Sequence, residues 1–218
     1  MEIFNPNDME RNQEEMQIEQ HILKKLKDKF GYDFLVRRIQ NRYGMGDFEN
    51  VLAICSMKDD ENMYFSVVYN VINKQIVDDN FFVKCTSHEL EKYILEELQN
   101  ANKQAVVRID IFGKRHLEKK YSVEELSELY KNNNFLSTII IKDKISEHEI
   151  EKIFKNINKK YKNIFLKSLI YTISKEDFKE FYQKVCTLPE ISETIIQEYT
   201  VNDMYIRKIY NNEVIKIK

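Results

Sequence analysis

Apolar residues along this chain switch between the spacing of a helix and the alternation of a strand. Up to Phe30 they recur near helical spacing, and Gly31 follows, where a left-handed residue commonly ends a helix. This pattern predicts one long amphipathic helix. Segments 33–43, 48–57 and 63–72 then alternate as strands do, with polar turns between them, which predicts an antiparallel meander.

The first half is predicted to close with a helix and one more strand. Thr86 and Glu89 have the spacing of a capping box, and an apolar helical stripe from Leu90 to Leu98 follows them. Residues 104–112 alternate again, with Arg108 and Asp110 on the polar face. The order predicted for this half is therefore α-β-β-β-α-β.

The second half uses the same sequence signals. Ser122 with Glu125 predicts a short helix, and Ser146 with Glu149 predicts a longer one. Strands at 135–142 and 164–173 flank the longer helix. Because β-α-β crossovers are right-handed, these two strands should be parallel if they share a sheet.

The end of the chain is predicted to hold one more helix and several strands. Ser174 and Asp177 open the helix, and 193–200, 203–210 and 213–217 are predicted as strands, so this half is β-α-β-α-β-β. The fold class is α+β with antiparallel or mixed sheets in two small lobes, 1–113 and 121–218. The boundary is placed between them because a polar run separates the two halves.

Composition and charge exclude several classes of protein. The chain has 218 residues, 43% of them hydrophobic, and a formal net charge of −2, so no global field draws it to nucleic acid or membrane. The first twenty residues are polar and acidic, unlike a signal peptide, and no stretch has the length and apolarity of a membrane span. We expect a cytoplasmic protein, or an extracytoplasmic one if a signal or anchor has been removed.

Glycine placement argues against nucleotide-binding loops. Gly44 and Gly46 are followed by Glu49, where a dinucleotide fingerprint needs its third glycine. Gly113 precedes Lys114 without the upstream glycine or the hydroxyl residue of a P-loop. The sequence therefore predicts no cofactor.

No catalytic or metal-binding residue is assigned from the sequence. The three cysteines are far apart and lack metal-ligand spacing, and His148 lacks a second histidine four residues later. Cys85 near a predicted helix start has His88 close by, which is the nearest approach to a thiol nucleophile with a base. Asp110 is the one hint of carboxylate chemistry, and Arg108 on the same face offers it a simple ion pair.

A basic run between the halves is the candidate partner-binding site. It could neutralise phosphates or meet an acidic protein, or it could be a solvated connection. The residues are Lys114, Arg115, His116, Lys119 and Lys120.

One segment resembles a known group of proteins. The stretch from Asn134 to Ile173, with IIIKDKISEHEIEKIFKNINKKYKN as a strand, a capped helix and the approach to a second strand, is similar to uncharacterised α+β proteins of low-GC Gram-positive bacteria. Several of those are membrane-tethered accessory proteins.

These observations favour a non-catalytic protein-binding or accessory protein, such as an immunity-like or interaction module, with another protein as its partner. A hydrolase of unrecognised type is one alternative. The other is a nucleic-acid-associated protein that uses the basic run. The oligomeric state stays open.

Overall fold

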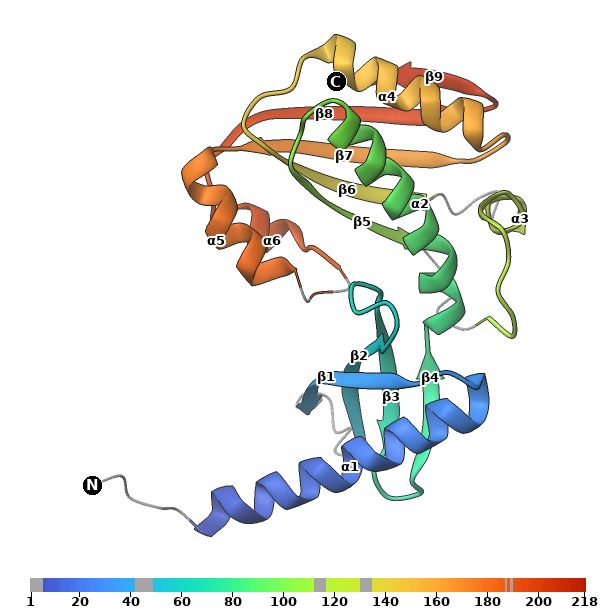
Figure 1. The fold of residues 1–218 in the computed structure, drawn as a ribbon, viewed down its shortest axis with the longest axis vertical. Helices are drawn as coiled ribbons and strands as arrows, with labels where there is room; N and C mark the ends of the chain where they lie inside the picture. Colours follow the sequence, from blue (N-terminus) through green and yellow to red (C-terminus); the bar gives the residue numbers. More distant parts are fainter. Residues whose placement is uncertain (1–5, 42–48, 112–116, 130–134, 187, 189) are drawn as a thin grey trace. The chain divides into compact units, whose positions relative to one another are not determined.

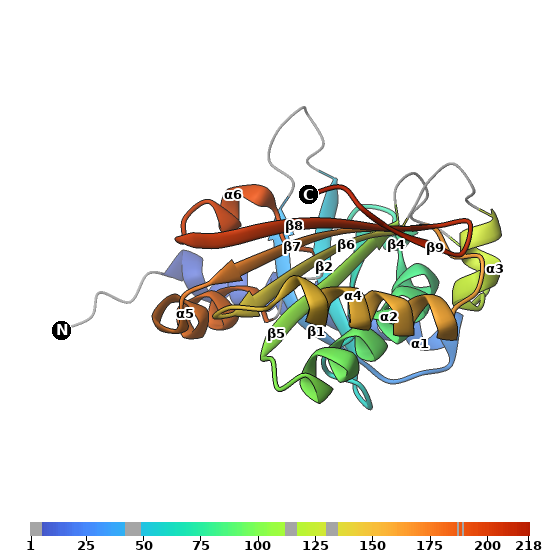
Figure 2. The ribbon, with the colours of Figure 1, turned by 90° about the horizontal axis from the view of Figure 1, so that it is seen from above.

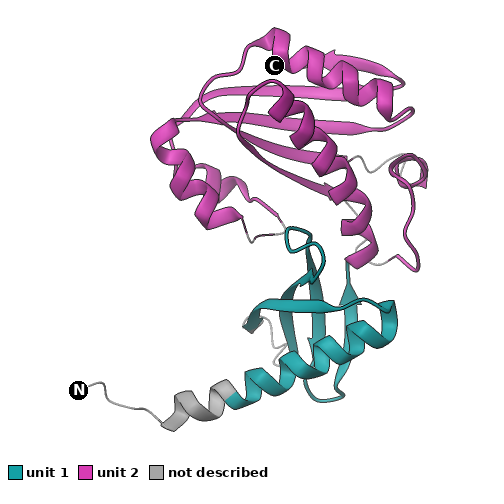
Figure 3. Ribbon diagram, in the orientation of Figure 1, with its two compact units in different colours: residues 1–80 teal, residues 81–218 magenta. Residues whose placement is uncertain are grey.

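A computed structural model describes residues 6–41, 49–111, 117–129, 135–186, 188 and 190–218 of the chain. Helices and strands are mixed through it, and the strands form one antiparallel and one mixed sheet, which confirms the α+β class (Figure 1). The chain divides into two compact units, residues 1–80 and residues 81–218 (Figure 3).

The first unit is a helix with an antiparallel sheet in the strand order β1-β2-β3-β4. Gly31 ends the helix with φ +78° and donates its N–H to the Lys27 carbonyl at 2.8 Å, as the sequence predicted. Ile22 and Leu26 of the helix are fully buried, as is Phe65, whose ring meets Phe34 edge-on at 5.5 Å. The elements are α1 (Pro6–Phe30), β1 (Phe34–Asn41), β2 (Asn50–Met57), β3 (Tyr64–Asn70) and β4 (Gln75–Asp79).

The second unit is a five-stranded sheet in the order β5-β6-β7-β8-β9, with helices before, between and after its strands. Only β6 and β7 are parallel neighbours, joined by the crossover through α4 that the sequence predicted. The elements are α2 (Phe81–Asn100), β5 (Ala105–Ile111), α3 (Val123–Leu129), β6 (Phe135–Lys142), α4 (Glu147–Lys160), β7 (Leu166–Ile173), α5 (Lys175–Val185), α6 (Glu193–Ile196), β8 (Val201–Tyr210) and β9 (Glu213–Lys216).

Strand alternation gives this sheet two separate cores. Val107 and Ile139 point to the face that α2 and α4 cover, which Figures 1 and 2 show on one side of the sheet. Val106 and Ile140, one residue along in each strand, point to the opposite face and pack with Phe178 and Phe181 of α5. Helices cover both faces of the sheet, so most of it is buried. β5 forms one of its two edges.

The domain boundary differs from the predicted one. β5 pairs along its length with β6, so α2 and β5 belong to the second unit, and the division follows Asn80 instead of lying near residues 113–121. The polar run falls within the range of the second unit, because polarity alone does not distinguish a linker between domains from a loop between strands.

Two element predictions were wrong, the strand β4 was not predicted, and two strong caps were right. Thr86 lies inside α2, where its hydroxyl donates to the Phe82 and Tyr121 carbonyls instead of capping a helix. Residues 193–196 form a short helix in place of the predicted strand. The capping boxes at Ser122 and Ser146 are present, each with its glutamate three residues later.

Candidate binding cleft

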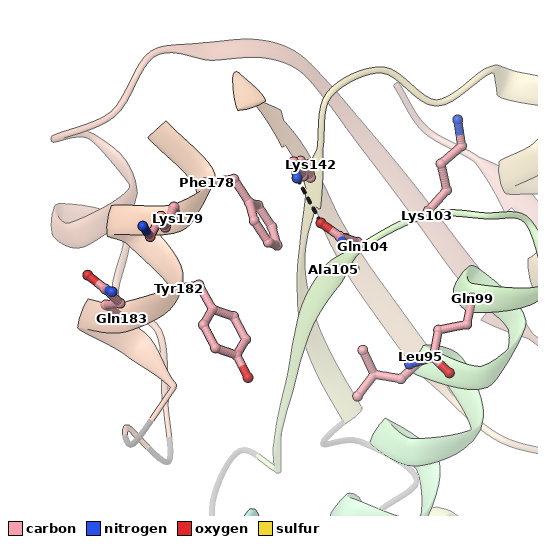
Figure 4. Close-up of a pocket in the computed structure, with 10 residues that line it drawn as sticks. All are labelled: Leu95, Gln99, Lys103, Gln104, Ala105, Lys142, Phe178, Lys179, Tyr182 and Gln183. Atoms are coloured by element: carbon pink, nitrogen blue, oxygen red, sulfur yellow. Dashed lines mark hydrogen bonds between the residues drawn. The ribbon is translucent and has the colours of Figure 1, made fainter. Parts of the chain in front are cut away.

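The second unit has a cleft of about 680 Å³ where β5 begins (Figure 4). One wall comes from the end of α2, the other from α5, and the start of β5 with the end of β6 lies between them. A volume of this size is typical of a ligand site. The lining residues are Leu95, Gln99, Lys103, Gln104, Ala105, Lys142, Phe178, Lys179, Tyr182 and Gln183.

Two stacked rings form the α5 wall. Ser174 caps this helix by accepting from the Asp177 N–H at 3.1 Å, and four-residue spacing then places Phe178 and Tyr182 on one face. Their rings stack at 6.3 Å with an interplanar angle of 28°. Phe178 is buried in the core, whereas Tyr182 is 49% exposed, and Figure 4 shows both rings pointing from α5 toward the cleft. The wall therefore has a fixed aromatic base and an accessible aromatic face.

The α2 wall is less polar and carries no charge. Leu95 is half-buried against the core and Gln99 follows it one helical turn later. In Figure 4 these side chains lie across from the two rings of α5. A ligand in the cleft would have an apolar contact on this side and an aromatic contact on the other.

Lysines supply all the ionic charge of the lining. Lys142 donates to the Gln104 side-chain oxygen at 2.9 Å, and this bond holds its ammonium beside the start of β5. Lys103 donates to the Lys144 carbonyl at 2.8 Å and lies 3.5 Å from Glu149, so part of its charge is balanced. Lys179 is exposed on α5. Because the lining contains no carboxylate, the cleft suits a ligand with negative charge.

The lining offers three lysines and one tyrosine as its proton-transfer groups. It contains no histidine, cysteine, aspartate, glutamate or serine to act as base or nucleophile. In the described ranges, no three His, Cys, Asp or Glu side chains gather where they could hold a metal ion. The arrangement can bind and orient a molecule that carries negative charge.

A buried polar cluster lies further along β5. Glu91 of α2 accepts from the Ile109 N–H at 2.7 Å and lies 3.0 Å from Nδ1 of His88. Lys84 donates to the Ile109 carbonyl at 3.0 Å and pairs with Asp110 at 2.9 Å. In this cluster, side chains of α2 bond to the backbone groups on the outer side of β5, the edge strand. The charged side chains of the cluster therefore have a structural role.

The sequence candidates for catalysis have structural partners here. His88 contacts Glu91, and Asp110 pairs with Lys84 instead of the predicted Arg108. Arg108 donates to the Leu188 and Cys186 carbonyls at 2.8 and 3.0 Å, which ties the end of α5 to the sheet. Cys85, predicted to lie just before a helix start, lies inside α2 and is partly buried.

The basic run is described in part. Lys114, Arg115 and His116 lie outside the described residues, as do Gly44, Gly46 and Gly113. Lys119 and Lys120 are exposed: the Lys119 ammonium lies 5.1 Å from the centre of the Tyr121 ring, and Lys120 lies 3.5 Å from Glu89. Neither lysine lines the cleft.

Sequence reasoning missed the cleft because its residues come from three distant segments. The one local signal was the i, i+4 pair Phe178 and Tyr182, since helical spacing puts both on the core-facing side while only one ring is buried. An aromatic residue left exposed at the rim of an apolar stripe is a usable indicator of a binding surface.

Comparisons with known proteins support the fold and go no further. No protein-family model and no curated protein matches the chain. The crystal structure of a DUF5037 family protein from Ruminococcus gnavus is similar to it, with a TM-score of 0.69, 14% sequence identity and coverage of 90% of this chain and 94% of that chain. Among the described residues, no helix combines the length and apolarity needed to cross a membrane.

Proposed function

We propose that this chain is a non-catalytic protein-binding protein whose cleft between α2 and α5 takes an acidic segment of a partner. The observation that carries the proposal is the lining itself: three lysines, two aromatic rings and no carboxylate around one concave site. Aromatic anchors in a pocket with complementary charge at its rim are the usual elements of protein recognition.

The chemistry of the cleft favours binding over turnover. A hydrolase most often uses a carboxylate, an imidazole, a thiol or a serine hydroxyl, and the lining residues supply none of these groups. The buried Glu91 and His88 are engaged by backbone and by each other, which fits a structural role. Recognition of an acidic segment requires only the groups that are present.

Fluorescence anisotropy with a labelled, acetylated octapeptide of alternating glutamate and valine tests the proposal. We expect saturable binding that weakens by about tenfold or more when salt rises from about 50 to about 300 mM, because the attraction is largely ionic. The same peptide with lysine in place of glutamate should not bind, since it meets like charges.

Replacing Lys142 and Lys179 together by Ser should abolish most of the binding. The matched control is Lys152→Ser with Lys159→Ser, which removes the same charge from exposed positions on α4 that are not part of the cleft. Equal loss in both double variants would contradict a specific site. Equal affinity for a single-stranded oligonucleotide of similar charge would favour nucleic acid as the partner instead.

A further inference from the structure

The free edge of β5 can be assigned residue by residue. Lys142 donates its N–H to the Gln104 carbonyl at 2.9 Å, so Gln104 faces β6. In an antiparallel ladder the N–H and C=O of one residue point the same way and those of the next residue point the other way. Ala105, Val107 and Ile109 therefore turn their backbone groups away from β6. The bonds from Ile109 to Glu91 and Lys84 agree with this assignment.

The three outward residues differ in what covers them. Both backbone groups of Ile109 are bound by side chains of α2, and Val107 is fully buried with its carbonyl accepting from Arg108 at 2.9 Å. Ala105 is partly exposed and lines the cleft. No residue in the described ranges bonds to the backbone N–H or C=O of Ala105. The cleft therefore contains one accessible, unused pair of strand hydrogen-bonding groups.

The two walls of the cleft lie on opposite faces of the sheet to which that pair belongs. Phe178 packs with the core on the α5 face, and Lys142 has the same parity along β6 as Ile140, which also points to that face. Leu95 packs with the core on the α2 face. A strand laid along Ala105 would direct alternate side chains to the two walls, one aromatic and cationic, the other apolar.

We infer that the acidic segment binds as an extended strand, exchanging a pair of hydrogen bonds with Ala105, with its acidic side chains toward Lys142 and Lys179 and its apolar ones toward Leu95. The inference rests on the proposed function and adds to it the conformation and side-chain pattern of the partner. Addition of a strand to an exposed sheet edge is a common way to bind peptides, because the backbone gives affinity and alternate side chains give specificity. The accessible edge is short, so the side-chain contacts must supply most of the affinity.

Backbone methylation of the peptide tests the strand geometry directly. Two forms of the alternating octapeptide are compared, one methylated on its glutamate amides and one on its valine amides. Alternate amides of a strand point to opposite edges, so one form loses the N–H that donates to the Ala105 carbonyl and places a methyl group against β5, whereas the other form keeps that donor. We expect the two affinities to differ by about tenfold, the effect of the lost hydrogen bond together with the steric clash of the methyl group. The form that binds better also tells whether the added strand is parallel or antiparallel.

A protein variant gives a second, independent readout. Ala105→Pro removes the outward N–H and no bond to β6, whereas Ala105→Val enlarges the side chain and keeps the donor. Binding of the unmethylated peptide should be about tenfold weaker in the proline variant than in the valine variant, because both enlarge the side chain and the proline variant alone lacks the donor. If the proline variant does not fold, the methylated peptides still decide the question.

The outcomes separate the inference from the function on which it rests. If an octapeptide of glutamate alone binds as tightly as the alternating one, and neither methylated form is weakened, the cleft binds acidic segments without strand pairing and the inference is overturned. If no acidic peptide binds, or if the Lys142 and Lys179 double variant binds as well as the parent, the proposed function fails and the inference fails with it. Slowed amide exchange at Ala105 on addition of the alternating peptide is the result expected if both hold.

Discussion

Along the outer edge of β5, backbone N–H and C=O groups point away from the neighbouring strand. The two ends of this edge satisfy these groups in different ways. At Ile109, side chains from the start and the middle of α2 satisfy both backbone groups, and Lys84 and Glu91 are buried to do so. At Ala105, the second half of α2 presents Leu95 and Gln99, which face the cleft and leave the backbone pair unused. One helix thus closes one part of the edge and borders the opening at the other.

This difference shows how one edge strand can be covered by side chains at one end and remain open to a ligand at the other. Unpaired backbone groups in a dry site cost about 1–3 kcal/mol each, so the buried end needs polar partners from somewhere. The open end can leave its groups to water and exchange that water for a ligand. The charges near Ile109 are buried because α2 covers that end of β5. The N–H and C=O of Ala105 have no described partner because that end of the strand is open to solvent.

Proline scanning should give the largest contrast between the two ends. Ile109→Pro removes the N–H that donates to Glu91 and most of a fully buried side chain, and should cost about 5 kcal/mol or more. Ala105→Pro removes a donor without a described partner and should cost about 1 kcal/mol or less. Thermal melting of both variants checks this. A proline at Ala105 as damaging as one at Ile109 would show that the open end is closed in solution.

Glu91→Ala should be the next most damaging change. It strips the Ile109 N–H and the His88 ring of a buried partner, and breaking such a network costs about 3–5 kcal/mol. Urea denaturation gives the value. Glu96→Ala, at an exposed position on the same helix, is the control and should stay within about 0.5 kcal/mol.

Lys84→Met tests how much the Lys84 ammonium contributes to stability at the covered end of β5. Methionine fills similar space but leaves the Ile109 carbonyl without its donor, and we expect a loss of about 1–3 kcal/mol. Asp110 is partly exposed, so water can solvate it when the ammonium is gone. The matched change at the open end, Lys179→Met, should leave stability within about 0.5 kcal/mol because that lysine is exposed. Similar losses of stability from Lys84→Met and Lys179→Met would mean that the two ends of β5 do not differ in this respect.

The smallest expected effect concerns a capping box beside the cleft. Bonds from the Ser146 amide and hydroxyl, with a smaller contribution from Lys103, hold the pKa of Glu149 below its ordinary value of 4.5. A lowered carboxyl pKa stabilises the fold above the ordinary value, and this stabilisation disappears as pH falls through the lower folded pKa. Glu149→Gln keeps the cap but removes the titration.

We therefore expect Glu149→Gln to cost about 1 kcal/mol or less near neutral pH, and the difference from the parent to shrink below about pH 4.5. Denaturation at several pH values measures the slope. A constant difference across pH would mean that the Glu149 charge does not contribute.

Local signals predicted well wherever a short stretch decides its own structure. Ser146 and Glu149 satisfy each other within one helical turn, and Gly31 adopts a conformation that costs other residues energy. The parallel pairing of β6 and β7 followed from the helix between them, because a crossover helix returns the chain to the end of the sheet where the first strand began. These outcomes depend on neighbours in sequence or on the connection between successive strands.

The signals failed where distant contacts override a local preference. Thr86 and Glu89 have capping spacing, but α2 begins five residues before Thr86 and gives its hydroxyl other carbonyls to bind. The alternation of 104–112 predicted a strand without naming its partner, so the sequence assigned β5 to the wrong half. Residues 193–196 show that a short apolar segment carries too little periodicity to separate helix from strand.

The sequence by itself determined the α+β class, the capped helices and the parity of side chains along the strands that it predicted, because these follow from local spacing and backbone chemistry. Only the tertiary structure decided that Phe178, Lys142, Leu95 and Ala105 border one cleft, since they come from four elements spread over more than a third of the chain. It also decided which end of β5 is closed, because that depends on how far each side chain of α2 reaches across to the neighbouring strand.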